Sequence, residues 1–365
     1  LLQRVVRVAL KGVDPRFTGD YRREHTKPHP SAQGKLLEAV ESIWTDAQKG
    51  RVLLCSQLHS AALEGVVAVP VAWVPKMNPD RTMSDSGRIV WDATPVNQDC
   101  HKNNHFPAGQ PQHQELTRAI LWWQSRLPGI TIFLSKKDVS EAFKWLWLQA
   151  AACGLFSPAP DLSNAAHGLT DEEQQVLRSL VAIYLSMTFG WVGAPGEFMA
   201  FIWVIKKLHA AHRLADRSWH DVVPFHSFFL MDDQALVEPH LGLRAPVSVA
   251  LAEASTQKVL GPQAINALKD AEEGRLETIK VIWGLIYDTE AGTRELPRPK
   301  LEKAWHLLHD GAFDYGNIHS MLRSWQELRG NQEFWVNVIP ALLELLRYTN
   351  KMLVPADPSG RVCPR

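Results

Sequence analysis

Three acidic side chains give this sequence its clearest candidate for chemistry. Asp138 ends the apolar stretch ITIFLSKKDV, which has the composition of a buried strand. Asp232 and Asp233 are adjacent and separate two further apolar runs, residues 224–231 and 234–239. Adjacent carboxylates beside apolar strands are costly to desolvate unless cations neutralise them. Two divalent metal ions about 3.5–4 Å apart need several hard oxygen ligands, which carboxylates and phosphoryl groups supply. We therefore interpret these acids as candidate ligands for a pair of metal ions.

Each acid has a simpler interpretation when it is taken alone. An Asp-Asp pair between two strands is most often the solvated tip of a hairpin, and an acid at a strand end often caps the backbone. Only a turn lets two neighbours serve one site, because alternate residues of a strand face opposite sides. The choice between these interpretations depends on the surrounding sequence.

The surrounding patterns mix helices and strands without regular alternation, which favours an α+β fold over a doubly wound one. Apolar spacing predicts helices beginning near Leu36 and covering 112–126, 171–180, 197–212 and most of the chain from 298 onward. Strands are predicted at 66–75 (broken by Pro70 and Pro75), 88–92, 130–139 and on both sides of the Asp-Asp turn within 224–239. Residues 21–34 and 151–170 have the composition of a linker and a loop.

Composition indicates a soluble, folded chain with a sizeable core. The 365 residues are 45% hydrophobic and 21% charged, which suits two or three packed subdomains. No apolar run is long enough to cross a bilayer, and no secretory signal is visible, so we expect an intracellular protein of the cytoplasm or nucleus with no membrane partner. Four scattered cysteines without a CxxC pair argue against a disulfide scaffold. Cys100, His101 and His105 lack the second ligand pair that a zinc site needs.

Charge gives little information about partners. The sequence has 39 basic and 39 acidic residues, and nucleic-acid binding depends on where basic residues cluster. Residues 1–35 are locally basic, and the simplest interpretation is a solvated N-terminal segment followed by a linker. Because the sequence starts at Leu1 and lacks an initiator Met, we expect a fragment or a processed piece of a longer protein.

Five blocks occur in the order that is found in the reverse transcriptase family of retroelements and retroviruses, which the sequence resembles over roughly residues 66–305. They are VPKMNPDRTMSDSGRIVWDATPVN (74–97), SKKDVSEAFKWLWL (135–148), MTFGWVGAPGEF (187–198), FFLMDDQALVE (228–238) and VIWGLIYDTEAGTRELPRPKL (281–301). The wording of the third and fifth blocks resembles retrotransposon enzymes more than retroviral ones. One departure is Leu230, which stands where the family usually has an aromatic residue before x-Asp-Asp.

The resemblance implies a role for each matched residue. Asp138, Asp232 and Asp233 would bind two Mg²⁺ ions, for which Mn²⁺ is a possible substitute. Lys76 and Arg88 would hold the triphosphate, Phe143 would exclude a 2′-hydroxyl, and Phe189 and Gly190 would lie near the nucleotide. Asp92 and Asn97 complete the first block. The lysine that protonates pyrophosphate could be Lys258, Lys269 or Lys280.

The resemblance also implies a right-hand polymerase fold, in which fingers and an antiparallel palm sheet backed by helices precede a helical thumb. The expected divisions are the N-terminal segment 1–35, fingers with early palm elements 36–137, palm 138–290, and thumb with the start of a connection 291–365. The implied activity is template-directed DNA synthesis from dNTPs on an RNA or DNA template with a primer.

Two other functions fit the same motifs. The chain could be a catalytically silent, polymerase-like scaffold that binds nucleic acid, although three intact acids argue against that. An RNA-dependent RNA polymerase is disfavoured by Phe143, because such enzymes usually place an acid where a ribose hydroxyl must be accepted.

Overall fold

A computed structural model of the chain describes all residues except 21–27, 57–65, 79–81, 159–169, 173–174, 176–179, 213–222, 310–319, 354–360 and 363–365. Among the described residues, no helix is long and apolar enough to cross a membrane.

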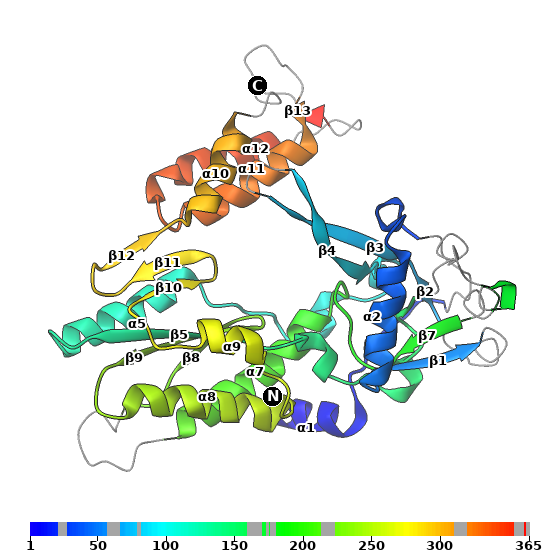
Figure 1. The fold of residues 1–365 in the computed structure, drawn as a ribbon, viewed down its shortest axis with the longest axis horizontal. Helices are drawn as coiled ribbons and strands as arrows, with labels where there is room; N and C mark the ends of the chain where they lie inside the picture. Colours follow the sequence, from blue (N-terminus) through cyan, green and yellow to red (C-terminus); the bar gives the residue numbers. More distant parts are fainter. Residues whose placement is uncertain are drawn as a thin grey trace.

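The centre of the molecule is an antiparallel sheet of three strands in the order β5-β9-β8. Its strands are β5 (Ile132–Asp138), β8 (Ser227–Leu230) and β9 (Asp233–Pro239). Alternation of side chains divides their apolar residues between two cores: Phe228 packs with Leu134 and helix α5 (His113–Arg126), whereas Phe229 packs with helix α7 (Ala194–Ala211). Helix α8 (Arg244–Leu260) follows β9, and Figure 1 shows α5 and α8 on opposite sides of the sheet.

The N-terminal half packs around α7. This half contains three small sheets and three helices, α1 (Leu2–Lys11), α2 (Leu36–Gln48) and α4 (Thr94–Asn97). Their strands are β1 (Val52–Ser56) with β7 (Leu180–Tyr184), β2 (Ala68–Val69) with β6 (Ser157–Pro158), and β3 (Val71–Met77) with β4 (Met83–Trp91). Short 3-10 turns cover Pro30–Ala32, Lys102–Asn104, Ala142–Trp145 and Ala150–Ala152.

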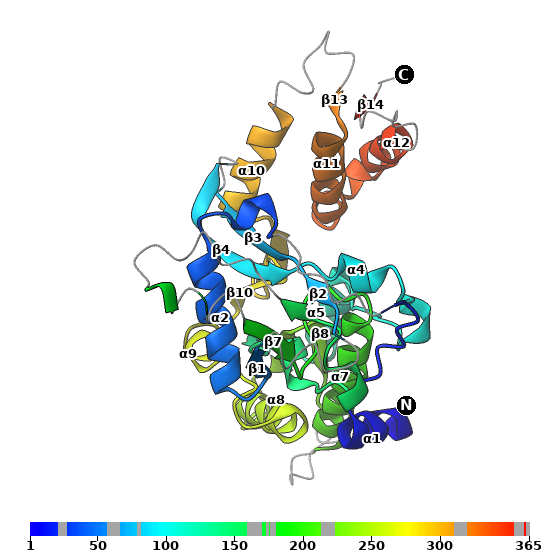
Figure 2. The ribbon, with the colours of Figure 1, turned by 90° about the vertical axis from the view of Figure 1, so that its right-hand side faces the viewer.

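The C-terminal part begins with short helix α9 (Ala267–Glu273) and a sheet in the order β10-β11-β12, formed by Ile279–Ile282, Leu285–Asp288 and Thr293–Glu295. Three helices follow, α10 (Arg298–Leu308), α11 (Leu322–Trp335) and α12 (Leu343–Leu353), with a 3-10 turn at Pro340–Leu342 and a small pair of strands, β13 (Ser320–Met321) and β14 (Arg361–Val362). In Figures 1 and 2 these helices and the β3–β4 hairpin lie on the same side of the central sheet.

Most of the elements expected from the sequence are present. The helices at α2, α5, α7 and α10, and the strand β5, begin within a few residues of their predicted positions. The strand expected at 66–75 is divided into β2 and β3 at Pro70, as its prolines predict. Most of the helix expected at 171–180 lies outside the described residues, and strand β7 starts at Leu180.

The interpretation of the N-terminal segment as a solvated tail is wrong for its first residues. Helix α1 buries Val5 and Val8, and Arg4 forms an ion pair with Glu197 of α7. The side chain of Glu197 is 2% exposed and also accepts a hydrogen bond from His105, 2.8 Å away. Burial raises the pKa of the Glu197 carboxyl, but its hydrogen bonds with His105 and Arg4 outweigh that effect, so the net shift is downward. A charge pattern alone cannot reveal this, because the partner acid lies 193 positions away.

The described cysteines are unpaired with one another, and Cys100 and His105 each contact another residue. The described cysteines, Cys55, Cys100 and Cys153, are free, and Cys363 lies outside the described residues. Cys100 donates to the Pro15 carbonyl while His105 is engaged with Glu197.

The ion pair between α1 and α7 gives a stability prediction. Replacing Arg4 with Met leaves the buried Glu197 carboxylate with His105 as its remaining partner, so we expect a loss of about 1–3 kcal/mol in the free energy of unfolding. Urea unfolding at neutral pH measures it. The matched control is Arg7→Met, which removes an exposed arginine from the same helix and should change stability by less than about 0.5 kcal/mol. Equal effects of the two variants would contradict the account.

Candidate functional site: three aspartates at the end of the central sheet

Backbone pairing brings the three acids together, and we call Asp138, Asp232 and Asp233 the aspartate cluster. Asp138 lies directly opposite Asp233 in the β5–β9 register. Residues opposite one another in an antiparallel pair have their Cβ atoms about 4.5–5.5 Å apart. Asp232 is in the turn before β9, and its carbonyl accepts a hydrogen bond of 2.9 Å from Val139 N–H, just beyond Asp138. Asp138 and two acids that lie 94 and 95 positions further along the chain therefore meet at one end of the sheet.

The turn itself is sharper than the sequence indicates. Met231 has φ of 55°, in the left-handed region that a residue with a side chain rarely adopts. Strand β9 starts at Asp233, so the turn consists of Met231 and Asp232 and the two adjacent acids belong to different elements. This arrangement lets both neighbours face one site, which a continuous strand does not allow.

The cluster carries excess negative charge. Burial raises the pKa of Asp232, and repulsion from Asp233 and Asp138 adds to that shift. Burial also raises the pKa of Asp233, although Lys136, 3.5 Å away, opposes it. Lys269 of α9 lies 2.8 Å from Oδ1 of Asp138. A divalent cation would relieve the same repulsion more completely than these lysines do, because it carries twice the charge.

The donor set suits Mg²⁺ chemically. Carboxylate oxygens are its preferred protein ligands, and a few carboxylates together with substrate phosphates are the usual shell. The side chains of Asp138 and Asp233 are engaged with lysines, however, and the described residues contain no group of three or more His, Cys, Asp or Glu side chains arranged around one metal position. Binding two ions would therefore require the carboxylates of the cluster to turn away from Lys269 and Lys136.

Two groups support the hairpin, namely Trp283 of the fifth sequence block and the pair Ser227 and His209, which was not predicted. The Trp283 indole donates a 3.2 Å hydrogen bond to the Asp233 carbonyl, and Trp283 is itself in a left-handed conformation with φ of 50°. On the other face, Ser227 of β8 contacts His209 of α7 at 2.7 Å and accepts from Gln234 at 2.9 Å. These contacts fix the backbone on both sides of the Asp-Asp turn.

The residues expected near a nucleotide fall into two groups. Phe143 is buried and lies 4.6 Å, centroid to centroid, from Phe189, whose side chain is exposed. Next to Phe189, Gly190 has φ of +90°, and a Cβ there would lie 3.2 Å from the Trp91 carbonyl. Asn97 binds both ends of this turn, donating to the Gly190 carbonyl and accepting from Val192 N–H, each at 2.8 Å.

The two predicted phosphate ligands lie in the β3–β4 hairpin. Lys76 and Arg88 are exposed, and with the described residues neither forms an ion pair. Arg88 is opposite Val74 in the strand register, and Val74 is two positions before Lys76 in β3. The two cations therefore lie at neighbouring places in the hairpin. The Asp92 side chain accepts a 2.9 Å hydrogen bond from the N–H of Thr94, the first residue of α4.

Of the three lysines considered as proton donors, Lys269 alone contacts the aspartate cluster within the described structure. Lys280 binds Glu277 and the Glu273 carbonyl. Lys258 is exposed on α8. The sequence does contain a signal for α9: Asn266 is an N-cap whose side chain accepts from Lys269 N–H, and this was missed because the helix is only seven residues long.

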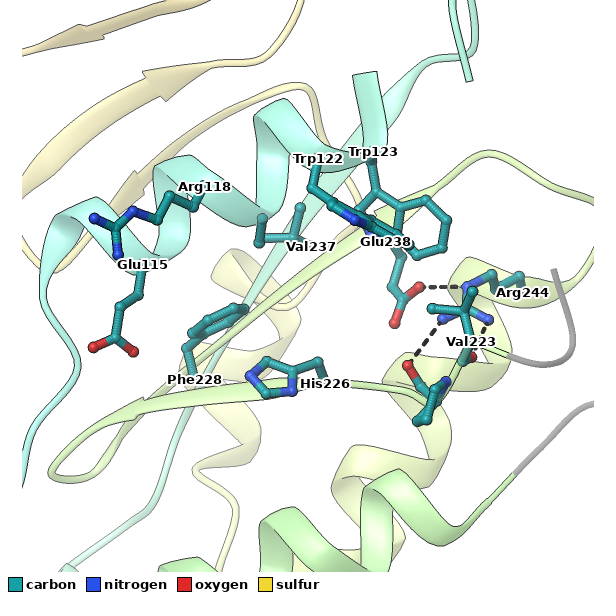
Figure 3. A pocket seen from close by; sticks show the side chains of 12 residues that line it. Glu115, Arg118, Trp122, Trp123, Val223, His226, Phe228, Val237, Glu238 and Arg244 are labelled. Atoms are coloured by element: carbon teal, nitrogen blue, oxygen red, sulfur yellow. Dashed lines mark hydrogen bonds and ion pairs between the residues drawn. The ribbon is translucent and has the colours of Figure 1, made fainter. Parts of the chain in front are cut away.

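A separate cavity of about 490 Å³ lies on the α5 side of the sheet, toward the far end of β9 (Figure 3). Trp122 and Phe228 line it, and at one side Glu238 forms a buried 2.8 Å ion pair with Arg244. Burial raises the pKa of Glu238 to about 7. Glu238 lies five positions along β9 from Asp233, so the cavity is not part of the aspartate cluster.

Comparison of folds identifies the architecture. The structure is similar to two structures of the foamy viral protease-reverse transcriptase in complex with double-stranded DNA. The TM-scores are 0.52 and 0.53 at 15% and 14% sequence identity, and each alignment covers 98% of this chain. The chain has a reverse-transcriptase-like fold. It spans about half the length of those proteins, with 48% and 58% of their chains covered. No protein-family model and no curated protein sequence matches it.

The buried His209 behind the hairpin makes the stability of this reverse-transcriptase-like fold depend on pH. Burial lowers the pKa of His209 to about 4, so between pH 4 and 6.5 the unfolded chain binds more protons than the folded one. Protonation of His209 therefore has no effect on the free energy of unfolding above pH 6.5. It lowers the free energy of unfolding as the pH falls to 4, by up to about 3 kcal/mol. Urea unfolding of the wild type and of His209→Gln across this range measures it, since Gln stays neutral. Equal pH slopes for the two proteins would exclude this role of His209.

Proposed function

We propose that this chain is an RNA-directed DNA polymerase of the retrotransposon type, which extends a primer on an RNA or DNA template by two-metal phosphoryl transfer. The observation that carries the proposal is the register that sets Asp138 opposite Asp233, with Asp232 in the adjoining turn. The similarity to DNA-bound structures of a viral reverse transcriptase, and the five sequence blocks in family order, support the same function.

Each residue of the proposed site has a physical task. Asp138, Asp232 and Asp233 would hold two Mg²⁺ ions, which, when bound, lower the pKa of the primer 3′-hydroxyl and stabilise charge on the transferring phosphoryl group. Lys76 and Arg88 would bind the triphosphate, where the exposed guanidinium can form a bidentate contact. In this arrangement the β3–β4 hairpin belongs to the fingers, the central sheet to the palm and α10–α12 to the thumb.

The paired rings would set the choice of sugar. Phe143 is held by Phe189 on one side and by Phe198, 5.6 Å away, on the other. A rigid ring held in this way under the sugar would leave no room for a 2′-hydroxyl, and Gly190, next to Phe189 in the chain, would lie near the nucleotide. The sequence blocks and this packing both favour deoxynucleotides.

The metal roles predict the effect of removing one carboxylate. Asp232→Asn should lower the rate of Mg²⁺-dependent primer extension with dNTPs by about 100-fold or more, because a neutral amide is a poor ligand for Mg²⁺. The folded state should be as stable or more so, because the substitution removes repulsion within the cluster. Primer extension and urea unfolding measure the two effects. The control is Glu41→Gln, which removes an exposed carboxylate from α2. Full activity of Asp232→Asn would exclude the assigned metal site.

The sugar gate predicts a change of selectivity beyond the loss of stability that any buried Phe→Ala substitution causes. Phe143→Ala should raise the ratio of ribonucleotide to deoxynucleotide incorporation by about tenfold, because it opens space under the sugar. Single-nucleotide extension with matched dNTP and NTP measures this ratio. Phe225→Ala is the control, since it removes another buried ring, which contacts His209 and Arg244 instead. An unchanged ratio in Phe143→Ala would exclude the gate.

A second candidate function is supported by one observation, the engagement of the acids with lysines. A polymerase-like scaffold that binds nucleic acid without catalysis would keep Asp138 paired with Lys269 permanently. Primer extension distinguishes the two candidates: a scaffold binds primer–template and extends nothing with Mg²⁺ or Mn²⁺, whereas a polymerase extends.

A further inference from the structure

Helix α9 is attached to the catalytic end of β5 by a ladder of ion pairs. Three consecutive residues of β5, Lys136, Lys137 and Asp138, face three residues of opposite charge on α9. The ion pairs, with their distances, are Glu273–Lys136 at 2.8 Å, Asp270–Lys137 at 2.6 Å and Lys269–Asp138 at 2.8 Å. β5 is an edge strand of its sheet, so a helix beside that edge can reach side chains of both faces.

The third of these ion pairs, between Lys269 and Asp138, involves an acid of the aspartate cluster. Lys269 lies at Oδ1 of Asp138, while the Asn266 amide lies 3.4 Å from Oδ2. Asn266 N–H also donates to the Asp138 carbonyl at 3.0 Å, which fixes the start of α9 against the end of β5. Both carboxylate oxygens of Asp138 are therefore engaged by the protein.

The two partners of this ion pair differ in how far they can move. The Asp138 side chain is 10% exposed and is held by the strand, whereas the Lys269 side chain is 50% exposed. The ammonium group can therefore move into solvent on its flexible four-carbon stem. Helix α9 would stay in place, because the ion pair between Asp270 and Lys137 remains. The Lys137 side chain is only 1% exposed and also binds Glu253 at 3.1 Å.

We propose that Lys269 is a displaceable counter-ion of the aspartate cluster: it pairs with Asp138 while no metal is bound and is expelled into solvent when a divalent ion binds there. The proposal rests on the proposed function, since it assigns a metal to Asp138. Metal affinity is then set by competition between one lysine charge and a divalent ion for the same oxygen. Lys269 is thus a positioning residue, which keeps Asp138 ordered and limits metal binding.

A lysine that competes with the metal and a lysine that supports the site have opposite effects on metal affinity. If Lys269 only held the site together, its removal would weaken metal binding. If it competes, Lys269→Gln should bind Mn²⁺ about three- to tenfold more tightly than the wild type, the range expected for losing one partly exposed, charge-assisted contact. Lys258→Gln is the matched control, because it removes the charge of an exposed α8 lysine that contacts none of the three acids.

The first experiment titrates the full chain with Mn²⁺ in the absence of nucleic acid and follows free Mn²⁺ by electron paramagnetic resonance.

The second experiment labels the wild type with an amine-acylating reagent, with and without MgCl₂ at ionic strength matched by NaCl, and maps the modified lysines by mass spectrometry. Labelling of Lys269 should rise several-fold with Mg²⁺, while labelling of Lys258 stays constant. In Asp138→Asn, Lys269 should label at the high level regardless of Mg²⁺.

The outcomes separate this inference from the proposed function. If the wild type binds Mn²⁺ and extends primers, yet Lys269→Gln binds Mn²⁺ no more tightly or Lys269 labelling ignores Mg²⁺, the counter-ion role is overturned and the polymerase stands. If no variant binds Mn²⁺ and the wild type extends nothing, both proposals are overturned.

Discussion

Electrostatic repulsion among three partly buried carboxylates is the constraint around which this end of the molecule is built. The β5–β9 register forces Asp138 and Asp233 to face each other, and the turn adds Asp232. Burial and mutual repulsion raise the pKa of Asp232 and of Asp233. Both carboxylates are therefore protonated more easily in the folded chain than in the unfolded chain. A fold keeps such an arrangement at a cost in stability, and clusters of this kind are typical of functional sites.

The rest of the sheet makes that cost tolerable by fixing the backbone. Trp283 holds the Asp233 carbonyl from one side, and the pair Ser227 and His209 supports β8 from the other. Left-handed backbone at Met231 and Trp283 shows that both tight turns are determined by their surroundings. The lysines of β5 and α9 then supply partial neutralisation. The cluster is thus rigid in its backbone and adjustable in its side chains, which suits a site that exchanges ions.

Sequence reasoning reached the parts of the site that local patterns encode. The strand before Asp138, the hairpin around Asp232 and the helix α7 follow from apolar spacing, and the motif order connects them. Phe143, Phe189 and Gly190 were expected to lie near one nucleotide, but the sequence could not specify their geometry, and the contact of Asn97 with Gly190 was not predicted. What the sequence could not reveal depends on pairings between distant residues, since Arg4 meets Glu197 and Lys269 meets Asp138 only after the chain has folded. Strand β7 was missed because its apolar run follows a helix-like pattern directly.

The central claim is that the aspartate cluster binds two metal ions, and anomalous diffraction from crystals containing Mn²⁺ and a dNTP tests it most directly. We expect two Mn²⁺ peaks about 3.5–4 Å apart at the aspartate cluster, with Lys269 turned away from Asp138. Crystals at saturating Mn²⁺ that show no ion between the strands, with Lys269 still on Asp138, would contradict it.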